Sequence, residues 1–543
     1  SVNERSEEGT PFDDLLGLGD MGSMGLDNLI SSIRKAKDEE NIKGIYIEGG
    51  SAGFDSPASA QQLRDALKDF KKSGKWIVSY ADNYSQASYY VATVADKIYL
   101  NGEGSLDLRG LGGKGEYYKG LYDKLGIKYL VAKVGKYKSY VESNTQTGMS
   151  EYDREQREAF LGGVWNYWLK EMAEGRKLKA DELNQLVNDS LLAFTSTEDL
   201  VKAKLIDKVM FPEEIKAEIK QRLKLGKDDD IEQLMLSDML NVKSKKKDEG
   251  DKIAIYYAYG SIVDNETMNM LNGGGHSIVG KTTAEDLRKL ADDDDVKAVV
   301  FRVNSGGGSA VASEQIRHAV KLLKAKKPVV VSMGGAAASG GYWISSPASY
   351  IFAEPTTITG SIGIFGLIPN FSGLVTDKLG VTFDGVKTNK FAGFETELVM
   401  GKDTDEIMAK MQNHINRGYQ SFLNIVSEGR GMKPEQVHEI AQGRVWLASD
   451  AIKIKLVDKL GSLDDAVKKA AELAKLKEYH TAAYPGQTNW LDNFMSKESK
   501  GSYLDAELRE LLGDAYLPLM QIRNDVKNNS RVQARMLDDI RVK

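Results

Sequence analysis

The sequence predicts an α/β protein made of two tandem domains that are related by internal duplication. Two observations support this prediction: a repeat with an offset near 253 residues, and in each copy an alternation of β-branched strands with amphipathic helices. Such alternation is typical of a largely parallel sheet covered by helices. At 543 residues the chain is also too long for a single hydrophobic core.

The first matched elements are a strand and the helix that follows it. IKGIYIE at residues 42–48 resembles VKAVVFR at 296–302, and a Gly/Ser-rich stretch follows each. QQLRDAL at 61–67 matches EQIRHAV at 314–320, and both place apolar residues at helical spacing. Each copy is therefore expected to contain a strand, a small-residue loop and an amphipathic helix in this order.

The longest match fixes the register of the repeat. Residues 76–100 align without a gap on residues 329–353, and both segments start with a buried β-branched strand. Further on, YDKLGIKY matches TDKLGVTF, AEGR matches SEGR, and KLIDK at 204–208 matches KLVDK at 455–459. The match therefore runs from residues 42–48 to 204–208 in the first copy and from 296–302 to 455–459 in the second.

The repeat divides the chain into four predicted segments: residues 1–225 as the first repeat, 226–251 as a charged linker, 252–480 as the second repeat, and 481–543 as a tail. We expect the tail to be helical and to serve packing or assembly. The strand predicted at 252–266 has no counterpart at the start of the chain. We therefore expect the native protein to continue upstream, where a membrane anchor could lie, with a shorter first domain as the alternative.

The composition excludes several classes of function. A net charge of -6 and a pI of about 5.7 argue against nucleic acid as a partner, because such proteins usually carry a basic surface. The chain has no cysteine, which excludes disulfides, cysteine-ligated metal sites and a cysteine nucleophile. The sequence contains no run of 18 or more apolar residues and therefore predicts no membrane span within it.

Ser339 is the candidate nucleophile. It lies in MGGAAASGGYW at residues 333–343, directly after the predicted buried strand PVVVS. Small neighbours let a substrate approach closely, and a helix N-terminus after the serine would favour developing negative charge. The alternative is an ordinary serine N-cap.

A glycine triplet in RVNSGGGSA, at residues 302–310, is the second signal. It follows a predicted buried strand, so its backbone N–H groups can form either an oxyanion hole or a phosphate cradle. No GK[ST] or GxGxxG spacing follows the triplet. Together with Ser339 one strand later, the pattern favours the oxyanion hole.

Histidine is the usual base for an attacking serine, but no histidine here has suitable neighbours in the sequence. All are interpreted as surface residues, namely His276, His318, His414, His438 and His480.

The repeat supplies Lys138 as the candidate base instead. KVGKYKSYVE at 133–142 aligns with KTNKFAGFET at 387–396, so that Lys138 is opposite Ala392, while Ser339 is opposite Gln86. Each copy keeps the group that the other has lost, as two repeats sharing one site would. Burial must lower the pKa of a lysine before it can act as a base. The alternative is a solvated lysine in a lysine-rich loop.

These motifs, together with TGSIGIFG at residues 359–366, resemble the long, tandem-repeat form of the S49 serine peptidases, the signal peptide peptidase A group, over nearly the whole chain. The resemblance implies two Clp protease/crotonase-like domains and hydrolysis of peptides. It gives Ser339 as the nucleophile and Lys138 as the base, with Ser361 orienting the lysine. Gly307 and Gly340 would form the oxyanion hole.

The same resemblance implies the biological setting. It predicts degradation of cleaved signal peptides and other apolar peptides at the outer face of the bacterial cytoplasmic membrane, by a homotetramer attached through an upstream anchor. It implies no metal or organic cofactor. The sequence departs from the family pattern at Gly306, where proline is usual, and at Tyr140 and Ser143 in the lysine loop.

Two other functions stay open from the residues alone. A crotonase-like acyl-CoA enzyme would share the strand, the glycine loop and the helix but would use carboxylates, and no glutamate follows the glycines before Glu314. A catalytically silent assembly scaffold would explain the degenerate first repeat and the altered lysine loop.

Overall fold

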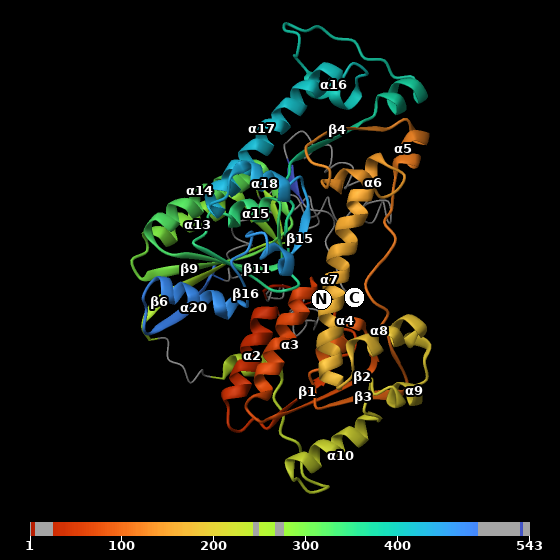
Figure 1. Cartoon of the computed structure of the whole chain (residues 1–543), viewed down its shortest axis with the longest axis vertical. Helices are drawn as coiled ribbons and strands as arrows, with labels where there is room; N and C mark the ends of the chain where they lie inside the picture. Colours follow the sequence, from red (N-terminus) through yellow and green to blue (C-terminus); the bar gives the residue numbers. More distant parts are fainter. Residues whose placement is uncertain (1, 6–24, 243–248, 266–275, 487–532, 536–543) are drawn as a thin grey trace, which may run out of the picture. The chain divides into compact units, whose positions relative to one another are not determined.

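A computed structural model describes residues 2–5, 25–242, 249–265, 276–486 and 533–535 (Figure 1). The chain forms two compact units. Unit 1 contains residues 1–112, 161–247 and 540–543, and unit 2 contains residues 113–160 and 248–539. The boundary near residue 160 falls within helix α7 (Glu151–Arg176).

Unit 1 contains a four-stranded parallel sheet in the order β1-β2-β3-β5. The strands are β1 (Gly44–Glu48), β2 (Trp76–Tyr84), β3 (Lys97–Leu106) and β5 (Lys208–Val209). Its helices are α2 (Leu26–Asp38), α3 (Pro57–Lys71), α4 (Gln86–Ala92), α8 (Ala180–Asp189), η3 (Leu192–Phe194), α9 (Thr197–Lys202), α10 (Pro212–Leu223) and α11 (Leu236–Asn241). Helix α10 packs Ile215 and Ile219 on Val78 and Tyr99 of the sheet.

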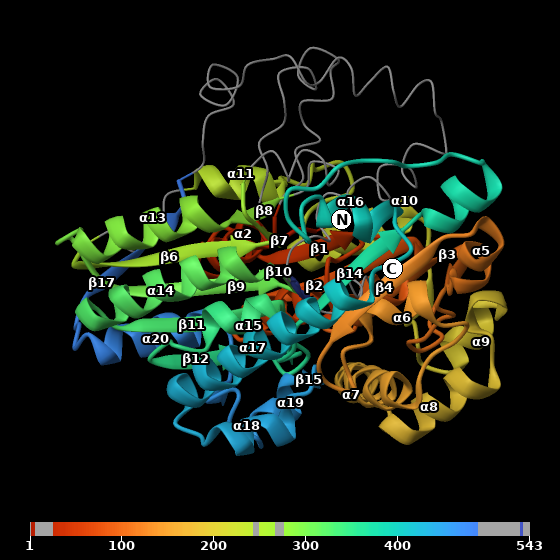
Figure 2. The same ribbon diagram turned by 90° about the horizontal axis from the view of Figure 1, so that it is seen from above.

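Unit 2 contains a larger sheet, which is parallel from β17 through β6, β9 and β11 to β13 (Figure 2). Its strands are β6 (Asp251–Tyr259), β9 (Val296–Ser305), β11 (Val329–Ala338), β12 (Tyr350–Ala353), β13 (Ile358–Gly360), β15 (Val445–Leu447), β16 (Lys459–Leu460) and β17 (Tyr479–Tyr484). Successive side chains of β9 alternate between two cores. Val299 packs among residues of α13 (Gly280–Asp292) and α14 (Ala310–Lys326), and Val300 packs among those of α20 (Leu463–Leu473).

A second sheet of unit 2 has the order β4-β14-β18-β10-β7-β8. It consists of β4 (Lys128–Lys133), β14 (Phe365–Asn370), β18 (Gln533–Arg535), β10 (Gly307–Ser309), β7 (Ser261–Val263) and β8 (Ser277–Val279). The other elements of the unit are α5 (Lys119–Leu125), η2 (Ser139–Val141), α6 (Glu142–Thr145), α15 (Gly340–Ser345), the π-helix η4 (Gly373–Lys378), α16 (Phe394–Met400), α17 (Asp405–Arg430), α18 (Pro434–Ile440) and α19 (Ala448–Ala451).

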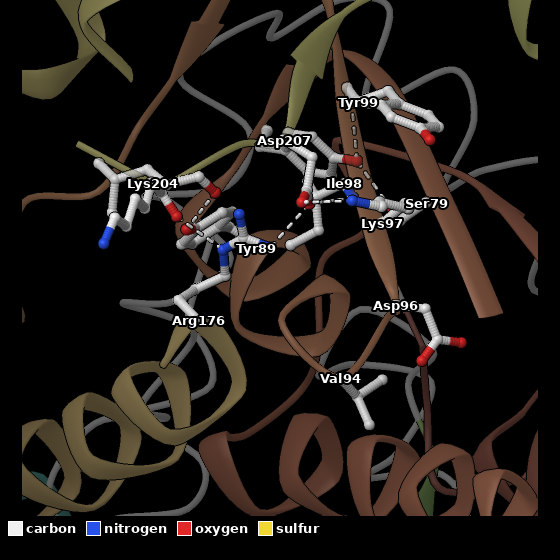
Figure 3. A network of polar contacts seen from close by, with 12 residues as sticks. Ser79, Tyr89, Val94, Asp96, Lys97, Ile98, Tyr99, Arg176, Lys204 and Asp207 are labelled. Atoms are coloured by element: carbon white, nitrogen blue, oxygen red, sulfur yellow. Dashed lines mark hydrogen bonds and ion pairs between the residues drawn. The ribbon is translucent and has the colours of Figure 1, made fainter. Parts of the chain in front are cut away.

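The α/β class and the duplication are confirmed. One polar network, in particular, occurs in both units. In unit 1, Asp207 accepts hydrogen bonds from Ile98 N at 2.9 Å and from Arg176 Nη1 at 2.9 Å (Figure 3). In unit 2, Asp458 accepts from Ile351 N at 2.8 Å and from Arg430 Nη1 at 3.0 Å. The AEGR and SEGR matches therefore mark one arginine–aspartate clamp that both copies keep.

The compact units differ from the segments that the repeat predicted. Residues 113–160 belong to unit 2, although they precede the second repeat in the sequence. The physical reason is strand pairing: β4 hydrogen-bonds in antiparallel fashion along the whole of β14. The segment that carries Lys138 is therefore held by a strand of the second repeat.

The described residues of the predicted linker and tail contain regular structure. Within the linker, α11 buries Met239, and Ser32 Oγ of α2 donates to Leu236 O at 2.9 Å. In the tail, β17 adds a parallel strand to β6, and residues 533–535 form β18 instead of a helix. The remaining tail residues, 487–532 and 536–543, lie outside the described part of the chain. Among the described residues, no helix has the length and apolar character that crossing a membrane requires.

Candidate active site

Ser339 occupies a strained turn between β11 and α15. Its backbone has φ 53° and ψ -115°, a conformation that costs a non-glycine residue about 1–3 kcal/mol. The turn is held because Ser339 N donates to Gly360 O at 2.8 Å, while Trp343 N donates to Ser339 O at 2.9 Å. A Cβ at Gly341 would lie 2.4 Å from Ser305 O, so only glycine fits there. The glycine at position 341 is thus required by close packing.

Three of the predicted site residues meet at the amine of Lys138. Its Nζ lies 2.9 Å from Ser339 Oγ and 3.0 Å from Ser361 Oγ, and it also donates to Ser361 O at 3.2 Å. The Lys138 residue is only 2% exposed. The alternative of a solvated lysine is therefore wrong.

The surroundings of Lys138 favour its neutral form. Burial lowers the pKa of its ammonium group well below the usual lysine value, and desolvation is the cause of this shift. Its three hydrogen-bond acceptors are two hydroxyl oxygens and one carbonyl oxygen, all uncharged. A neutral amine within hydrogen-bonding distance of a serine hydroxyl can accept its proton.

Ser361 presents two oxygen atoms to the lysine because of an unusual backbone conformation. Its φ is 50°, and it follows Gly360, whose φ is 78°. Ser361 N donates to Arg444 O at 2.7 Å, which ties the turn to the chain before β15. The left-handed turn lets both Ser361 Oγ and Ser361 O approach Lys138 Nζ.

Gly443 supports the lysine, and sequence reasoning missed it. A Cβ at Gly443 would lie 2.7 Å from both Lys138 N and Lys138 Cβ, and its φ is 80°. Gly363 packs against the other end of the side chain, where a Cβ would lie 3.3 Å from Lys138 Cδ. Gly363 belongs to the TGSIGIFG motif quoted above, whereas Gly443 lies in no motif that the sequence analysis used.

A buried polar network holds the loop on either side of Lys138. Ser139 Oγ donates to Asp153 Oδ1 at 2.6 Å, and Gln156 Nε2 donates to Ser139 Oγ at 2.8 Å and to Tyr137 O at 3.1 Å. Val445 N donates to Gln156 Oε1 at 3.1 Å. Asp153 and Gln156 are thus supporting residues that the sequence pattern did not reveal.

The two predicted oxyanion donors differ in the hydrogen bonding of their backbone N–H groups. Gly340 is the first residue of α15, where backbone N–H groups have no intrahelical acceptor. Gly307 has φ 104°, and its N–H donates to Ser305 Oγ at 3.1 Å. A substrate oxyanion would therefore have to replace the Ser305 hydroxyl as the acceptor for Gly307.

The strand β10, which contains part of the glycine loop, is paired with an extended segment of the same chain. Strand β18 lies between β10 and β14 and is antiparallel to both. Gly308 faces Ala534, and Phe365 faces Gln533 in this arrangement. The edge of β10 that belongs to the glycine loop can thus pair with a peptide strand.

The histidines are mostly surface residues. His276, His318, His414 and His438 are exposed, as predicted, whereas His480 is half-buried in β17. The carboxylate of Glu314 is also engaged elsewhere, because it accepts from Arg317 Nε at 2.8 Å and from Trp343 Nε1 at 3.0 Å. The carboxylate that an acyl-CoA enzyme would need is therefore already bound to other groups.

The counterparts of the site residues in the other repeat have different surroundings. Gln86, the counterpart of Ser339, is buried, and its Oε1 accepts from Arg109 N at 3.0 Å and from Gly110 N at 2.8 Å. Ala392, the counterpart of Lys138, is exposed. Tyr140, one of the departures from the family pattern, packs its ring 5.0 Å from that of Phe365 and so fits beside β14.

Comparisons of this sequence with a family model and with known proteins agree on one family. The sequence model of peptidase family S49 matches residues 69–226 and 321–477, one region in each repeat. "Protease 4" of Salmonella typhi is 37% identical over 92% of this chain and 80% of its own length. "Protease 4" of Haemophilus influenzae is 38% identical over 85% of this chain and 75% of its own length.

Two more distant likenesses cover part of the chain. The "Putative signal peptide peptidase SppA" of Enterococcus faecium is 34% identical over 38% of this chain and 61% of its own length. A solved structure of a ClpP1 mutant from Listeria monocytogenes covers 39% of this chain and 94% of its own, with 17% identity and a TM-score of 0.26.

Proposed function

Because this chain belongs to peptidase family S49 and is a serine peptidase of that family, we propose that it cleaves peptides with a Ser339–Lys138 dyad. The observation that carries the proposal is the 2.9 Å contact between Lys138 Nζ and Ser339 Oγ in a buried site. Both residues belong to unit 2, although they come from different repeats.

In the proposed reaction, Ser339 Oγ attacks the carbonyl carbon of the scissile bond while its proton passes to Lys138 Nζ. The N–H groups of Gly340 and Gly307 stabilise the oxyanion. Collapse of the tetrahedral intermediate expels the amine, which takes the proton from Lys138. A water molecule, deprotonated by the same lysine, then hydrolyses the acyl-enzyme. Ser361 keeps the amine directed at the nucleophile throughout.

The proposed substrates are extended apolar peptides, including the remnants of cleaved signal peptides. Pairing of β18 with β10 supports binding of the substrate as an antiparallel strand. The neighbouring strand β14 contributes Phe365 and Leu367 to an apolar cluster with Val141. The similarity to a putative signal peptide peptidase supports the choice of signal-peptide remnants.

The remaining parts of the proposal rest on the resemblance of the sequence motifs alone. By that resemblance we place the peptidase at the outer face of the bacterial cytoplasmic membrane, attached through an upstream anchor, and working as a homotetramer. The chemistry above needs only the residues of this chain and water, and it invokes no cofactor.

Hydrolysis of a fluorogenic apolar peptide between about pH 6 and pH 10 tests the dyad. Ser339→Ala and Lys138→Ala should each lose activity by a factor on the order of 10³ or more. Lys136→Ala is the matched control, since Lys136 is an exposed lysine of the same loop. Normal rates with Lys138→Ala would place the base elsewhere. A wild type inactive towards peptides and acylating probes alike would favour the assembly scaffold.

A further inference from the structure

One short segment contacts both sides of the site around the Lys138 amine. We call residues 441–446, which lead into β15, the bridging segment. On the lysine side, Tyr137 N donates to Gln442 O at 3.0 Å, and Gly443 packs against the backbone of Lys138. Gln442 has φ 55°, a strained conformation for a residue other than glycine. Such strain persists only where the surrounding structure enforces it.

On its other side, the bridging segment holds the turn that contains Ser361. Ser361 N donates to Arg444 O at 2.7 Å, and Gly443 N donates to Ile362 O at 2.9 Å. The bridging segment thus touches the backbone of Lys138 and that of Ser361, whose two oxygen atoms accept from the lysine amine. A shift of this segment would change the distance between the lysine and its acceptors.

The side chain of Arg444 ties the bridging segment to the lysine loop. Arg444 Nη1 donates to Tyr137 OH at 2.9 Å and to Glu155 Oε1 at 2.6 Å. Tyr137 OH in turn donates to Glu155 Oε2 at 2.9 Å, which closes a ring of three hydrogen bonds. We call Arg444, Glu155 and Tyr137 the Arg444 network. Because Tyr137 directly precedes Lys138, this network fixes the backbone from which the lysine side chain extends.

The guanidinium group of Arg444 also lies over two aromatic rings. Its Cζ is 4.8 Å from the centroid of the Tyr137 ring and 4.4 Å from that of the Trp446 ring. Trp446 Nε1 donates to Ile440 O at 2.9 Å, which fixes the second ring. Arg444 Nε is buried and finds no acceptor among the described residues. A buried N–H without an acceptor is costly, so the side chain keeps this orientation because its other contacts enforce it.

Helix α7 gives independent evidence, because two consecutive residues of the helix hold two consecutive residues of the bridging segment. Glu155 binds the side chain of Arg444, and Gln156 Oε1 accepts from Val445 N at 3.1 Å (Figure 2). Gln156 Nε2 also donates to Tyr137 O at 3.1 Å. All of these residues belong to unit 2. The start of α7 therefore sets the position of the lysine loop and of the bridging segment together.

We propose that Arg444 and Glu155 are positioning residues, which hold the amine of Lys138 at the distance from Ser361 and Ser339 that proton transfer needs. This proposal deepens the proposed function and rests on it. The two side chains are 20% and 48% exposed, and ion pairs of such exposure add little to stability. A small displacement of a catalytic group, in contrast, is costly for the rate. Loss of the pair should therefore affect catalysis more than folding.

Steady-state hydrolysis of a fluorogenic apolar peptide tests the pair. Arg444→Met and Glu155→Ala should each lower kcat by about 10- to 100-fold with little change in KM. Arg444→Lys keeps the charge but lacks the planar group, so its kcat should lie between those of Arg444→Met and the wild type. Glu428→Ala is the matched control, because Glu428 is also an exposed helical glutamate of unit 2, paired with Lys321 at 2.5 Å. The control should keep the kcat of the wild type.

The pH profile supplies a readout that a merely structural role would not move. Hydrogen bonds from Tyr137 and Arg444 lower the pKa of the Glu155 carboxyl, and burial raises the pKa of Tyr137. The Arg444 network therefore keeps its charges between about pH 6 and pH 10, so the rising limb of kcat/KM reports Lys138. A loosened bridging segment admits water to the amine, which raises its pKa. The limb should accordingly move to higher pH in Arg444→Met and in Glu155→Ala.

A double variant tests whether the two residues act through one contact. Arg444→Met combined with Glu155→Ala should be no slower than the slower single variant, because either change alone already breaks the pair. The proposal is overturned if Arg444→Met keeps the kcat of the wild type, if only KM changes, or if the limb does not move. Multiplied losses in the double variant, or an equal loss in Glu428→Ala, would overturn it as well.

Denaturant unfolding separates failure of this proposal from failure of the proposed function, because it needs no substrate. The free energy of unfolding begins to rise with pH at the folded pKa of Lys138, which burial lowers. In Arg444→Met this rise should begin at a higher pH than in the wild type. The difference should vanish when both chains also carry Lys138→Met. An unchanged onset in Arg444→Met would overturn the proposal, even for a wild type that cleaves no peptide.

Discussion

Lys138 Nζ and Ser339 Oγ lie 2.9 Å apart, although 201 residues separate them in the sequence. The contact depends on two serines with positive φ, Ser339 with φ 53° and Ser361 with φ 50°. Residues other than glycine rarely adopt a positive φ, because it strains the backbone. This strain persists only where the surrounding structure enforces the conformation. Both strained residues contact the same amine, which places the strain where the proposed chemistry needs a fixed geometry.

The pH dependence of peptide hydrolysis should show a rising limb caused by deprotonation of Lys138. Burial lowers the pKa of the amine well below the usual lysine value, and only the neutral form accepts the Ser339 proton. kcat/KM should therefore fall as the pH decreases through that lowered pKa and reach a plateau above it. Steady-state kinetics across the pH range measures the limb. A limb at the ordinary lysine pKa would contradict a buried base.

The same burial should make stability depend on pH. The relevant pH window lies between the lowered pKa of Lys138 in the folded chain and the ordinary lysine pKa in the unfolded chain. Within this window the unfolded chain binds a proton that the folded chain does not. The free energy of unfolding should therefore rise with pH by about 1.4 kcal/mol per pH unit. The gain begins as the pH rises through the folded pKa and is complete above the unfolded pKa. Lys138→Met keeps an unbranched buried side chain without the charge and should abolish this part of the slope. Denaturant unfolding of the wild type and of Lys138→Met at several pH values measures the difference, and parallel curves would be inconsistent with a neutral buried lysine.

Ser361 should act as a positioning residue. Ser361→Gly removes the hydroxyl while tolerating the positive φ, so it should lower kcat by roughly 10- to 100-fold with little change in KM. The rising limb of the pH profile should also move, because the hydroxyl is one of the three acceptors around Lys138 Nζ. Ser361→Ala is the companion variant, which loses the hydroxyl but keeps the backbone strain. A rise in KM with unchanged kcat and an unmoved limb would argue against this role.

Much of this site was predictable because the duplication leaves a comparison inside the sequence. Lys138 opposite Ala392 and Ser339 opposite Gln86 identify the pair without any other protein. The repeat could not show that residues 113–160 join unit 2, because their place in that unit depends on hydrogen bonds between β4 and β14.

The supporting contacts were beyond sequence reasoning for a different reason. Gly443 and Gln156 reach Lys138 and its loop through packing between segments that are distant in sequence, and glycines or glutamines of this kind occur throughout the chain. The positive φ of Ser361 is likewise imposed by its surroundings, because serine has no intrinsic preference for it.

Gly443→Ala should impair catalysis by displacing Lys138. The new methyl group would lie 2.7 Å from the lysine backbone and Cβ, too close for a real contact, so the loop must shift. We expect kcat to fall by about 100-fold, in line with the cost of a displacement of about 1 Å in an active site. Gly431→Ala is the matched control, since Gly431 also has a positive φ but no atom within 4 Å of the position that the new methyl group would take. Equal losses of activity in the two variants would attribute the effect to backbone strain alone.

Strand β18 should compete with peptide substrates, because it occupies the edge of β10 that a substrate strand would use. A chain ending at residue 486 keeps β17 and lacks β18, so its KM for an extended apolar peptide should be lower than that of the full chain, with kcat unchanged. Ala534→Pro is the more conservative variant: it removes one backbone N–H opposite Gly308, and the ring disfavours continued pairing. Its KM should fall in the same direction. Unchanged KM in both variants would mean that β18 leaves the edge of β10 readily enough not to compete. A loss of activity in both would mean that the strand is needed to shape the glycine loop.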